Sequence, residues 1–129
     1  MPSRVWSHIS DYAAMDANGK AMIIGEFDQI FAKNVPIKYH LLYVSVKWSG
    51  SDKETFTHAI RITSPSRNQI AVSNTIQTTI NGGVQGIGNH VSVNAFMMVD
   101  LPDFGEYAVE ILLDGNPVHI MPLTVVRRS

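Results

Sequence analysis

Hydrophobic and polar residues alternate along the chain in runs of about 6–10 positions, separated by clusters of Gly, Asn, Asp and Pro. Alternation with a period of two is typical of strands with one buried face, whereas windows with the 3.6-residue period of a helix are scarce. The pattern therefore predicts an all-β protein of about eight short antiparallel strands, in a single sandwich domain that spans residues 1–129.

The third predicted strand has the clearest alternation. Its proposed inward residues are His40, Leu42, Val44, Val46 and Trp48, and its proposed outward residues are Tyr39, Leu41, Tyr43, Ser45 and Lys47. The fourth predicted strand directs inward Phe56, His58, Ile60 and Ile62. On the sixth, the apolar set that we assign inward is Val91, Val93, Ala95, Met97 and Val99. This parity leaves Phe96 and Met98 facing outward.

The N-terminal part of the chain predicts two strands joined by a tight turn. The first covers residues 7–15, and Asn18-Gly19 suits the positive φ values of a hairpin turn. The second covers residues 20–31 and carries Gly25 in its middle, where a missing side chain marks a bulge or a close approach of another group.

The closing segment, residues 103–118, combines a turn, an alternating strand and a hairpin reversal. The strand places Tyr107, Val109, Ile111 and Leu113 on one face. A two-residue reversal at Asp114-Gly115 or Gly115-Asn116 would add Val118 and Ile120 to that face. A bulge at Pro122, which cannot donate a backbone hydrogen bond, would then turn Leu123 and Val125 inward.

The segment Asp103-x-Gly105-x-Tyr107 resembles the tyrosine corner of immunoglobulin-like domains, in which the tyrosine hydroxyl bonds to upstream backbone. The resemblance implies an immunoglobulin-like antiparallel β-sandwich. Two positions depart from the antibody pattern: Val109 stands where the second cysteine is usual, and Trp48 is hard to place as the usual tryptophan. These departures argue against an antibody-type core but not against the sandwich.

A wider set of segments is similar to a small bacterial family classed as a domain of unknown function. The segments are Asp11-Tyr12-Ala13, Asp16-Ala17-Asn18-Gly19-Lys20, Ile24-Gly25-Glu26-Phe27-Asp28-Gln29-Ile30, Phe104-Gly105-Glu106-Tyr107 and Asp114-Gly115. This resemblance implies a short standalone sandwich and supplies no established activity.

Composition and charge narrow the possible partners. The chain is 45% hydrophobic and 16% charged, as in a folded domain. Ten basic residues face eleven acidic residues without a strong cluster of either, so we expect neither nucleic acid nor a membrane as partner. No cysteine is present, and the N-terminus lacks the apolar core of a signal peptide. Cytoplasmic residence is the expectation.

No motif predicts catalysis or a cofactor. Ser7, His8, Ser10 and Asp11 are residue types of a hydrolase triad, but they share one short strand, where neighbouring side chains point to opposite faces. The inward histidines His40 and His58 would lie far apart if their strands form a direct hairpin, so we expect no metal site. We therefore expect a protein that is not an enzyme and has no cofactor.

Two candidate sites remain. The first is an apolar outer surface of Tyr39, Leu41, Tyr43, Phe96 and Met98, which would bind a second copy of the chain, as a dimer, or another protein. Alternatively, the long N-terminal segment covers this surface. The second is a loop containing Gly82, Gly83, Gly86 and Gly88, which would grip a small molecule or a glycan.

Overall fold

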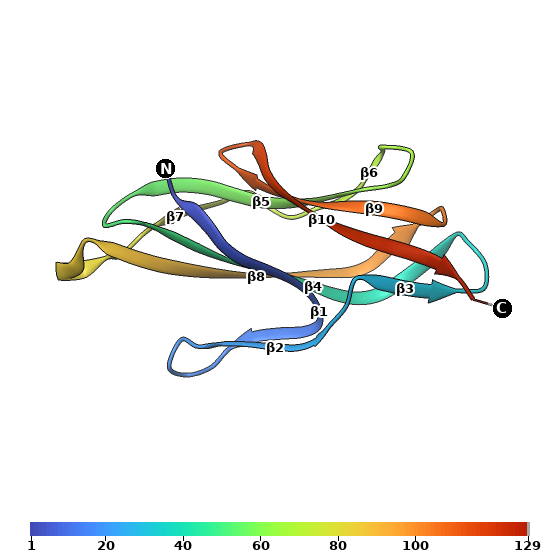
Figure 1. Cartoon of the computed structure of the whole chain (residues 1–129), viewed down its shortest axis with the longest axis horizontal. Helices are drawn as coiled ribbons and strands as arrows, with labels where there is room; N and C mark the ends of the chain where they lie inside the picture. Colours follow the sequence, from blue (N-terminus) through green and yellow to red (C-terminus); the bar gives the residue numbers. More distant parts are fainter. Residues whose placement is uncertain (129) are drawn as a thin grey trace.

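The computed structural model describes residues 1–128 and shows two β-sheets that face each other (Figure 1). The strands are β1 (Ser3–Met15), β2 (Ala21–Glu26), β3 (Gln29–Ala32), β4 (Ile37–Ser51), β5 (Thr55–Thr63), β6 (Gln69–Val72), β7 (Ile76–Thr79), β8 (Ile87–Leu101), β9 (Gly105–Leu113) and β10 (Asn116–Arg127). One 3-10 turn, η1 (Gly83–Gln85), precedes β8. Within the described residues, no helix has the length and apolar character needed to cross a membrane.

The first sheet has the strand order β2-β1-β4-β8, and the second has the order β3-β10-β9-β5-β6, with β7 also pairing with β5. All pairs are antiparallel except β3 with β10, which is parallel. The all-β prediction is confirmed. The third and sixth predicted strands, which carry the predicted apolar surface, are β4 and β8, and they pair with each other.

The predicted count of about eight strands was too low, because the described residues form ten, and one predicted strand accounts for one of the two additional strands. Residues 20–31 divide into β2 and β3, which belong to different sheets. Gly25 lies near the end of β2 with φ +72°, and a Cβ there would lie 2.6 Å from the Asp11 carboxylate. The predicted close approach at Gly25 is therefore correct, and the chain leaves the first sheet directly after it.

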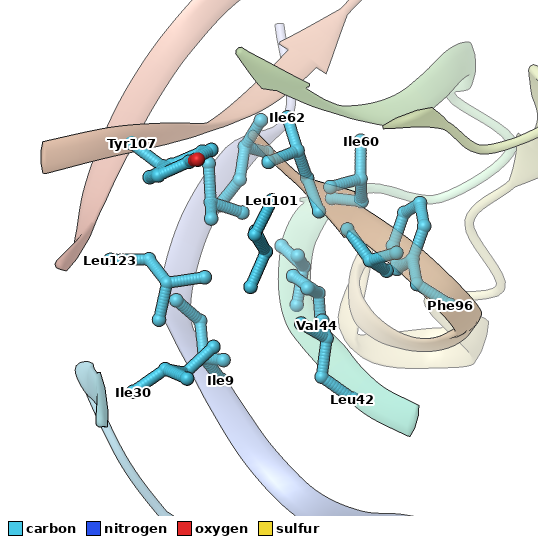
Figure 2. Close-up of a cluster of buried hydrophobic side chains, with 14 of the residues drawn as sticks. Ile9, Ile30, Leu42, Val44, Ile60, Ile62, Phe96, Leu101, Tyr107 and Leu123 are labelled. Carbon is cyan, nitrogen blue, oxygen red and sulfur yellow. The ribbon is translucent and has the colours of Figure 1, made fainter. Parts of the chain in front are cut away.

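The core lies between the two sheets (Figure 2). Leu42 and Val44 of β4 are fully buried, and Ile60 and Ile62 of β5 face them from the second sheet. Burial of this apolar surface drives the sheets together, at roughly 25 cal/mol per Å² removed from water. The predicted inward residues that are buried are Leu42, Val44, Val46, Trp48, Phe56, His58, Ile60, Ile62, Val99, Tyr107, Val109, Ile111, Leu113, Leu123 and Val125.

The tyrosine corner is present in the structure. The Tyr107 hydroxyl donates to the backbone oxygen of Asp103 at 2.7 Å and accepts from the backbone N–H of Asp103 at 2.9 Å. The ring itself is fully buried, so the two bonds satisfy a hydroxyl that has no access to water. The corner fixes the turn through which the chain enters β9.

The β9–β10 hairpin differs from the prediction in register. Asp114 and Gly115 form the two-residue reversal, with φ values of 50° and 83°. The bulge lies between Pro117 and His119 and not at Pro122, so His119 pairs with Ile111 while Val118 and Ile120 are exposed. The bulge at Val118 thus resets the parity before Pro122, and Leu123 and Val125 are buried as expected.

Candidate interaction surface

The outer face of the first sheet, which we define as the side turned away from the second sheet, carries the apolar residues of β8. Cross-strand partners share a face, and Val44, Val46 and Trp48 point inward. Their partners on β8 are Asn94, Ser92 and His90. The predicted parity of β8 was therefore wrong: the inner face is largely polar, and the outer face carries Val91, Val93, Ala95 and Met97.

Two residues of the predicted interface were placed wrongly: Phe96 faces inward because it pairs with Leu42, and Tyr39 because of a kink that β4 and β8 share. Pairing is interrupted at His40 and Met98, and Met98 has a φ of +51°. On one side of the kink Leu42 pairs with Phe96, which is 7% exposed and belongs to the core. On the other side Tyr39 pairs with Val99, which is buried.

The kink therefore changes which residues face inward. Tyr39 packs against the core, with its ring 5.9 Å from that of Phe27, so it does not belong to an outward surface. Phe96 is excluded for the same reason, and His40 is exposed although it was predicted inward. Of the predicted interface residues, Leu41 and Tyr43 are half-buried on the outer face and Met98 is 51% exposed.

The β1–β2 hairpin covers part of the outer face. β1 pairs with β4 up to Ser10 and from there on only with β2, and the hairpin doubles back beneath the sheet (Figure 1). The Tyr12 ring lies 5.5 Å from the Tyr43 ring, nearly perpendicular to it. Ala13 is 4% exposed, and Ser45 on the outer face is fully buried. The alternative in which the N-terminal segment covers the surface is thus realised in part.

The remainder of the outer face lies towards the free edge of β8. This strand ends the first sheet, and none of the described residues pairs with its other edge. Met97, on the outer face beside that edge, is 71% exposed. A strand edge presents unpaired N–H and C=O groups, which proteins commonly protect with charges or proline. Between Val91 and Val99 the strand contains neither.

A groove of about 410 Å³ runs beside this free edge. One wall is the edge itself at residues 93–96, and the other is the link between β6 and β7. Val72 and Ile76 of that link are exposed, so the groove is partly apolar, while Ser73 and Asn94 add hydrogen-bonding groups. The arrangement offers both a backbone edge and an apolar flank to an added strand.

The local backbone structure explains why residues 82–88 contain glycines. A Cβ on Gly82 would lie 2.7 Å from the backbone nitrogen of Ile87, and one on Gly88 would lie 2.3 Å from the backbone oxygen of Asn81. Gly83 and Gly86 have positive φ values in the η1 turn. The carboxylate of Asp52 accepts from the backbone N–H of Gly82 at 2.8 Å and holds the loop in place. The loop does not line the groove beside the edge of β8.

Two histidines, His58 and His90, face each other inside the sandwich. β4 and β5 lie in different sheets, so His58 faces His90 of β8, with ring centroids 5.6 Å apart, while His40 lies outside. The His58 Nε2 atom is 2.8 Å from the Thr78 hydroxyl. Burial, with a smaller contribution from His90, lowers the pKa of His58 to about 4. Residues 1–128 contain no group of three or more potential metal ligands.

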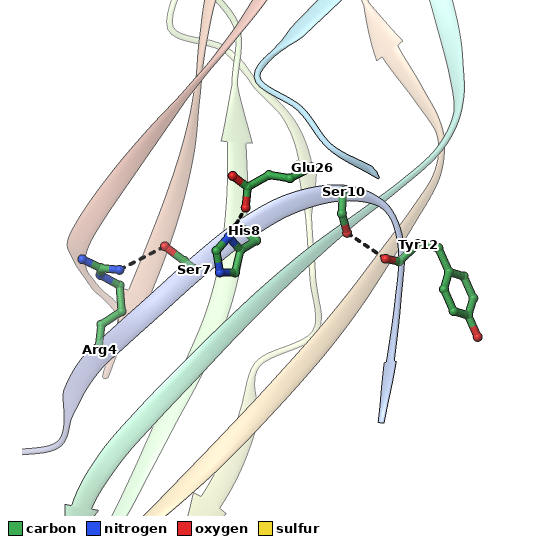
Figure 3. Close-up of polar contacts among 6 residues, drawn as sticks. All are labelled: Arg4, Ser7, His8, Ser10, Tyr12 and Glu26. Carbon is green, nitrogen blue, oxygen red and sulfur yellow. Dashed lines mark hydrogen bonds and ion pairs between the residues drawn. The ribbon is translucent and has the colours of Figure 1, made fainter. Parts of the chain in front are cut away.

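The side chains of β1 that resemble a triad make separate contacts (Figure 3). His8 pairs with Glu26, the Ser7 hydroxyl accepts from the Arg4 guanidinium, and the Ser10 hydroxyl donates to the backbone oxygen of Tyr12. The structure therefore does not join His8 to either serine as a nucleophile and base would be joined.

Comparison with known proteins gives a family but no activity. A family model described as a family of unknown function, DUF6941, matches residues 5–126. The curated proteins contain no significant match to the sequence. The match agrees with the expected resemblance to a family of unknown function and spans nearly all of the chain.

Proposed function

The chain belongs to DUF6941, a family of unknown function, and on this premise we propose that it is a non-enzymatic self-assembly module whose partner is a second copy of itself. The observation that carries the proposal is the free edge of β8, which is long, uncharged between Val91 and Val99, and flanked by exposed methionines. An edge of this kind is a template for another strand.

A second β8 fits this edge chemically. Two β8 strands related by a two-fold axis run antiparallel, and every residue then meets a residue of the same strand in the other copy. With the axis near Asn94, Val93 lies opposite Ala95 and Val91 lies opposite Met97 of the second copy. Apolar outer-face residues thus meet each other, and no like charges oppose one another across the central part of the edge.

The surroundings of the edge supply the rest of an interface. Leu41 and Tyr43 extend the apolar outer face beside β8, and Val72 and Ile76 flank the edge on the other side. A stable interface buries about 1,200–2,000 Å² in total, more than a strand edge alone provides. The flanking residues supply the additional apolar area, so the module needs both the edge and its flanks.

The substitution Met97→Lys tests this proposal. Lysine places a charge beside the edge, where it opposes strand addition, and the exposed position costs little in the folded monomer, within about 0.5 kcal/mol. Met22→Lys is the matched control, because Met22 is a 41% exposed methionine of β2 and does not belong to the edge of β8.

Light scattering after size exclusion, at two protein concentrations, gives the readout. We expect a dimer mass for the native chain and for Met22→Lys, and a monomer mass for Met97→Lys. A native chain that is monomeric at both concentrations, or a Met97→Lys variant with the mass of the native protein, would exclude the β8 dimer.

For the fold, we propose that the sandwich is immunoglobulin-like. The Tyr107 corner and the pairing of β4 with β8 support this assignment. The absence of cysteine supports residence in a reducing compartment, for which we propose the cytoplasm.

A further inference from the structure

A second groove lies between the tip of the β1–β2 hairpin and the outer face that the hairpin covers. Its volume of about 770 Å³ falls within the range of small-molecule sites. Trp6, Lys47 and Val91 line it from the sheet, and Met15 and Lys20 line it from the hairpin. β1 contributes to both walls, with Trp6 in the sheet and Met15 in the hairpin, and the other lining residues come from the turn after β1, from β2, β4 and β8.

The groove has a positive character. Lys20 and Lys47 both line it, and no carboxylate is among its lining residues. Within residues 1–128, neither ammonium group forms an ion pair with an aspartate or glutamate. Two cations without a protein partner in one cavity favour an anionic ligand.

The nearest acidic residue of the hairpin tip is engaged elsewhere. The Asp16 carboxylate accepts from the backbone N–H groups of Asn18 and Lys20, each at 2.8 Å. The Asp16 N–H also donates to the Lys20 backbone oxygen at 2.8 Å. These bonds fix the backbone that carries Lys20, so one of the two cations is placed by a rigid turn.

The apolar part of the groove suits a ring. Trp6 is half-buried, and its ring lies 5.0 Å from that of His8, which limits its freedom. Met15 and Val91 add aliphatic surface, and Asn89 adds an amide. An aromatic face next to hydrogen-bonding and charged groups is a combination that binds flat or ring-shaped polar molecules.

We propose that this groove binds a small ring compound that carries a phosphate or carboxylate, with the anion between Lys20 and Lys47 and the ring against Trp6. Two sources share this chemistry: nucleoside monophosphates and acidic monosaccharides. This site is separate from the residue 82–88 loop, and it shares Val91 with the edge of β8.

Calorimetric titration with two anionic probes and their neutral counterparts tests the site. Adenosine monophosphate is compared with adenosine, and glucuronic acid with glucose. We expect saturable binding of at least one anionic probe and at least about tenfold weaker binding of its neutral counterpart, because hydrogen bonds to charged groups are the stronger ones. The anionic probe that binds more tightly identifies the source of the ligand.

Substitutions of the lining residues test whether the probe binds in the groove. Lys47→Gln and Lys20→Gln are each expected to weaken the bound probe about tenfold. Lys38→Gln is the matched control, because Lys38 lies on the same strand at the other end and pairs with Asp100. Trp6→Leu is expected to weaken the probe while the thermal unfolding of all four variants stays close to that of the native chain.

Three results would overturn the proposal. The first is the absence of saturable binding for both anionic probes. The second is equal binding of an anionic probe and its neutral counterpart. The third is binding by Lys20→Gln and Lys47→Gln that matches the native protein, which would place the anion elsewhere.

Discussion

β9 and β8 are both strands with alternating side chains, but they occupy different positions. β9 lies inside the second sheet between β10 and β5, whereas β8 ends the first sheet. On β9 the buried face is apolar and the opposite face carries Glu106 and Glu110. On β8 the inner face carries His90, Ser92 and Asn94, and the apolar residues from Val91 to Met97 other than Phe96 face outward. The face that a strand buries is therefore set by its neighbours as well as by its own polarity.

The apolar faces of β9 and β8 are therefore covered to different extents. The apolar face of β9 is buried by β4 and its neighbours within the core. That of β8 is covered by the β1–β2 hairpin only towards Val91, and Ala95 and Met97 stay exposed. The stability of the monomer should thus depend strongly on β9 and weakly on the outer face of β8.

The largest expected effect tests this contrast directly. Ile111→Ala on β9 removes three buried carbons from a fully buried position, so we expect a loss of about 2–5 kcal/mol in the free energy of unfolding. Met97→Ala on β8 should change that free energy by less than about 0.5 kcal/mol. Urea unfolding of both variants measures the two values. Equal losses would contradict the contrast between the strands.

The next largest effect is the acid sensitivity of folding that arises from His58, which contacts His90 on the polar inner face of β8. In the folded chain the pKa of His58 is about 4, whereas the unfolded value is near 6.5. A lowered histidine pKa means that the unfolded state binds more protons, so this stabilisation is complete above pH 6.5 and is lost as the pH falls towards 4. The loss amounts to about 3 kcal/mol, at 1.36 kcal/mol per pKa unit.

Unfolding free energies measured across this pH range test the assignment. His58→Gln should reduce the pH dependence, and the remainder comes in part from His90 and His119, whose pKa values burial also lowers. His40→Gln is the matched control, because His40 is exposed on the outer side, and it should keep the dependence of the native chain. A His58→Gln variant as sensitive to acid as the native chain would place the titration elsewhere.

The features that were predicted correctly depend on short segments. The Tyr107 corner spans five residues, and the Asp114-Gly115 reversal is encoded by its own two residues. The inward faces of β5 and β9 were predicted correctly because both strands have apolar alternation and because the first sheet covers their apolar side. In these cases the local pattern and the tertiary surroundings agree.

The candidate surface was only partly predictable, because its determinants are distant in sequence. Which face of β8 turns inward depends on its pairing with β4 and on the β1–β2 hairpin, about 70 residues earlier. As a result, most of the alternating apolar residues of β8 lie on the outer face, opposite to what their pattern predicts. The positive φ of Met98 is uncommon for methionine, so the kink that turns Tyr39 inward had no sequence signal. The only available hint was Phe96, a large aromatic residue on an otherwise polar face.

The smallest expected effect contrasts the charged outer face of β9 with the uncharged outer face of β8. Glu110 on β9 accepts two hydrogen bonds from the Arg61 guanidinium on β5, each at 3.0 Å, and this contact lowers the pKa of Glu110. The pair is partly exposed, so we expect Glu110→Gln to cost only about 0.2–1 kcal/mol near neutral pH. The native advantage should shrink as the pH falls and Glu110 is protonated, because a depressed carboxylate pKa stabilises the folded state only above that range. A double-mutant cycle with Arg61→Gln isolates the pair, and a coupling energy of zero would show that the charges on β9 serve solubility and not stability.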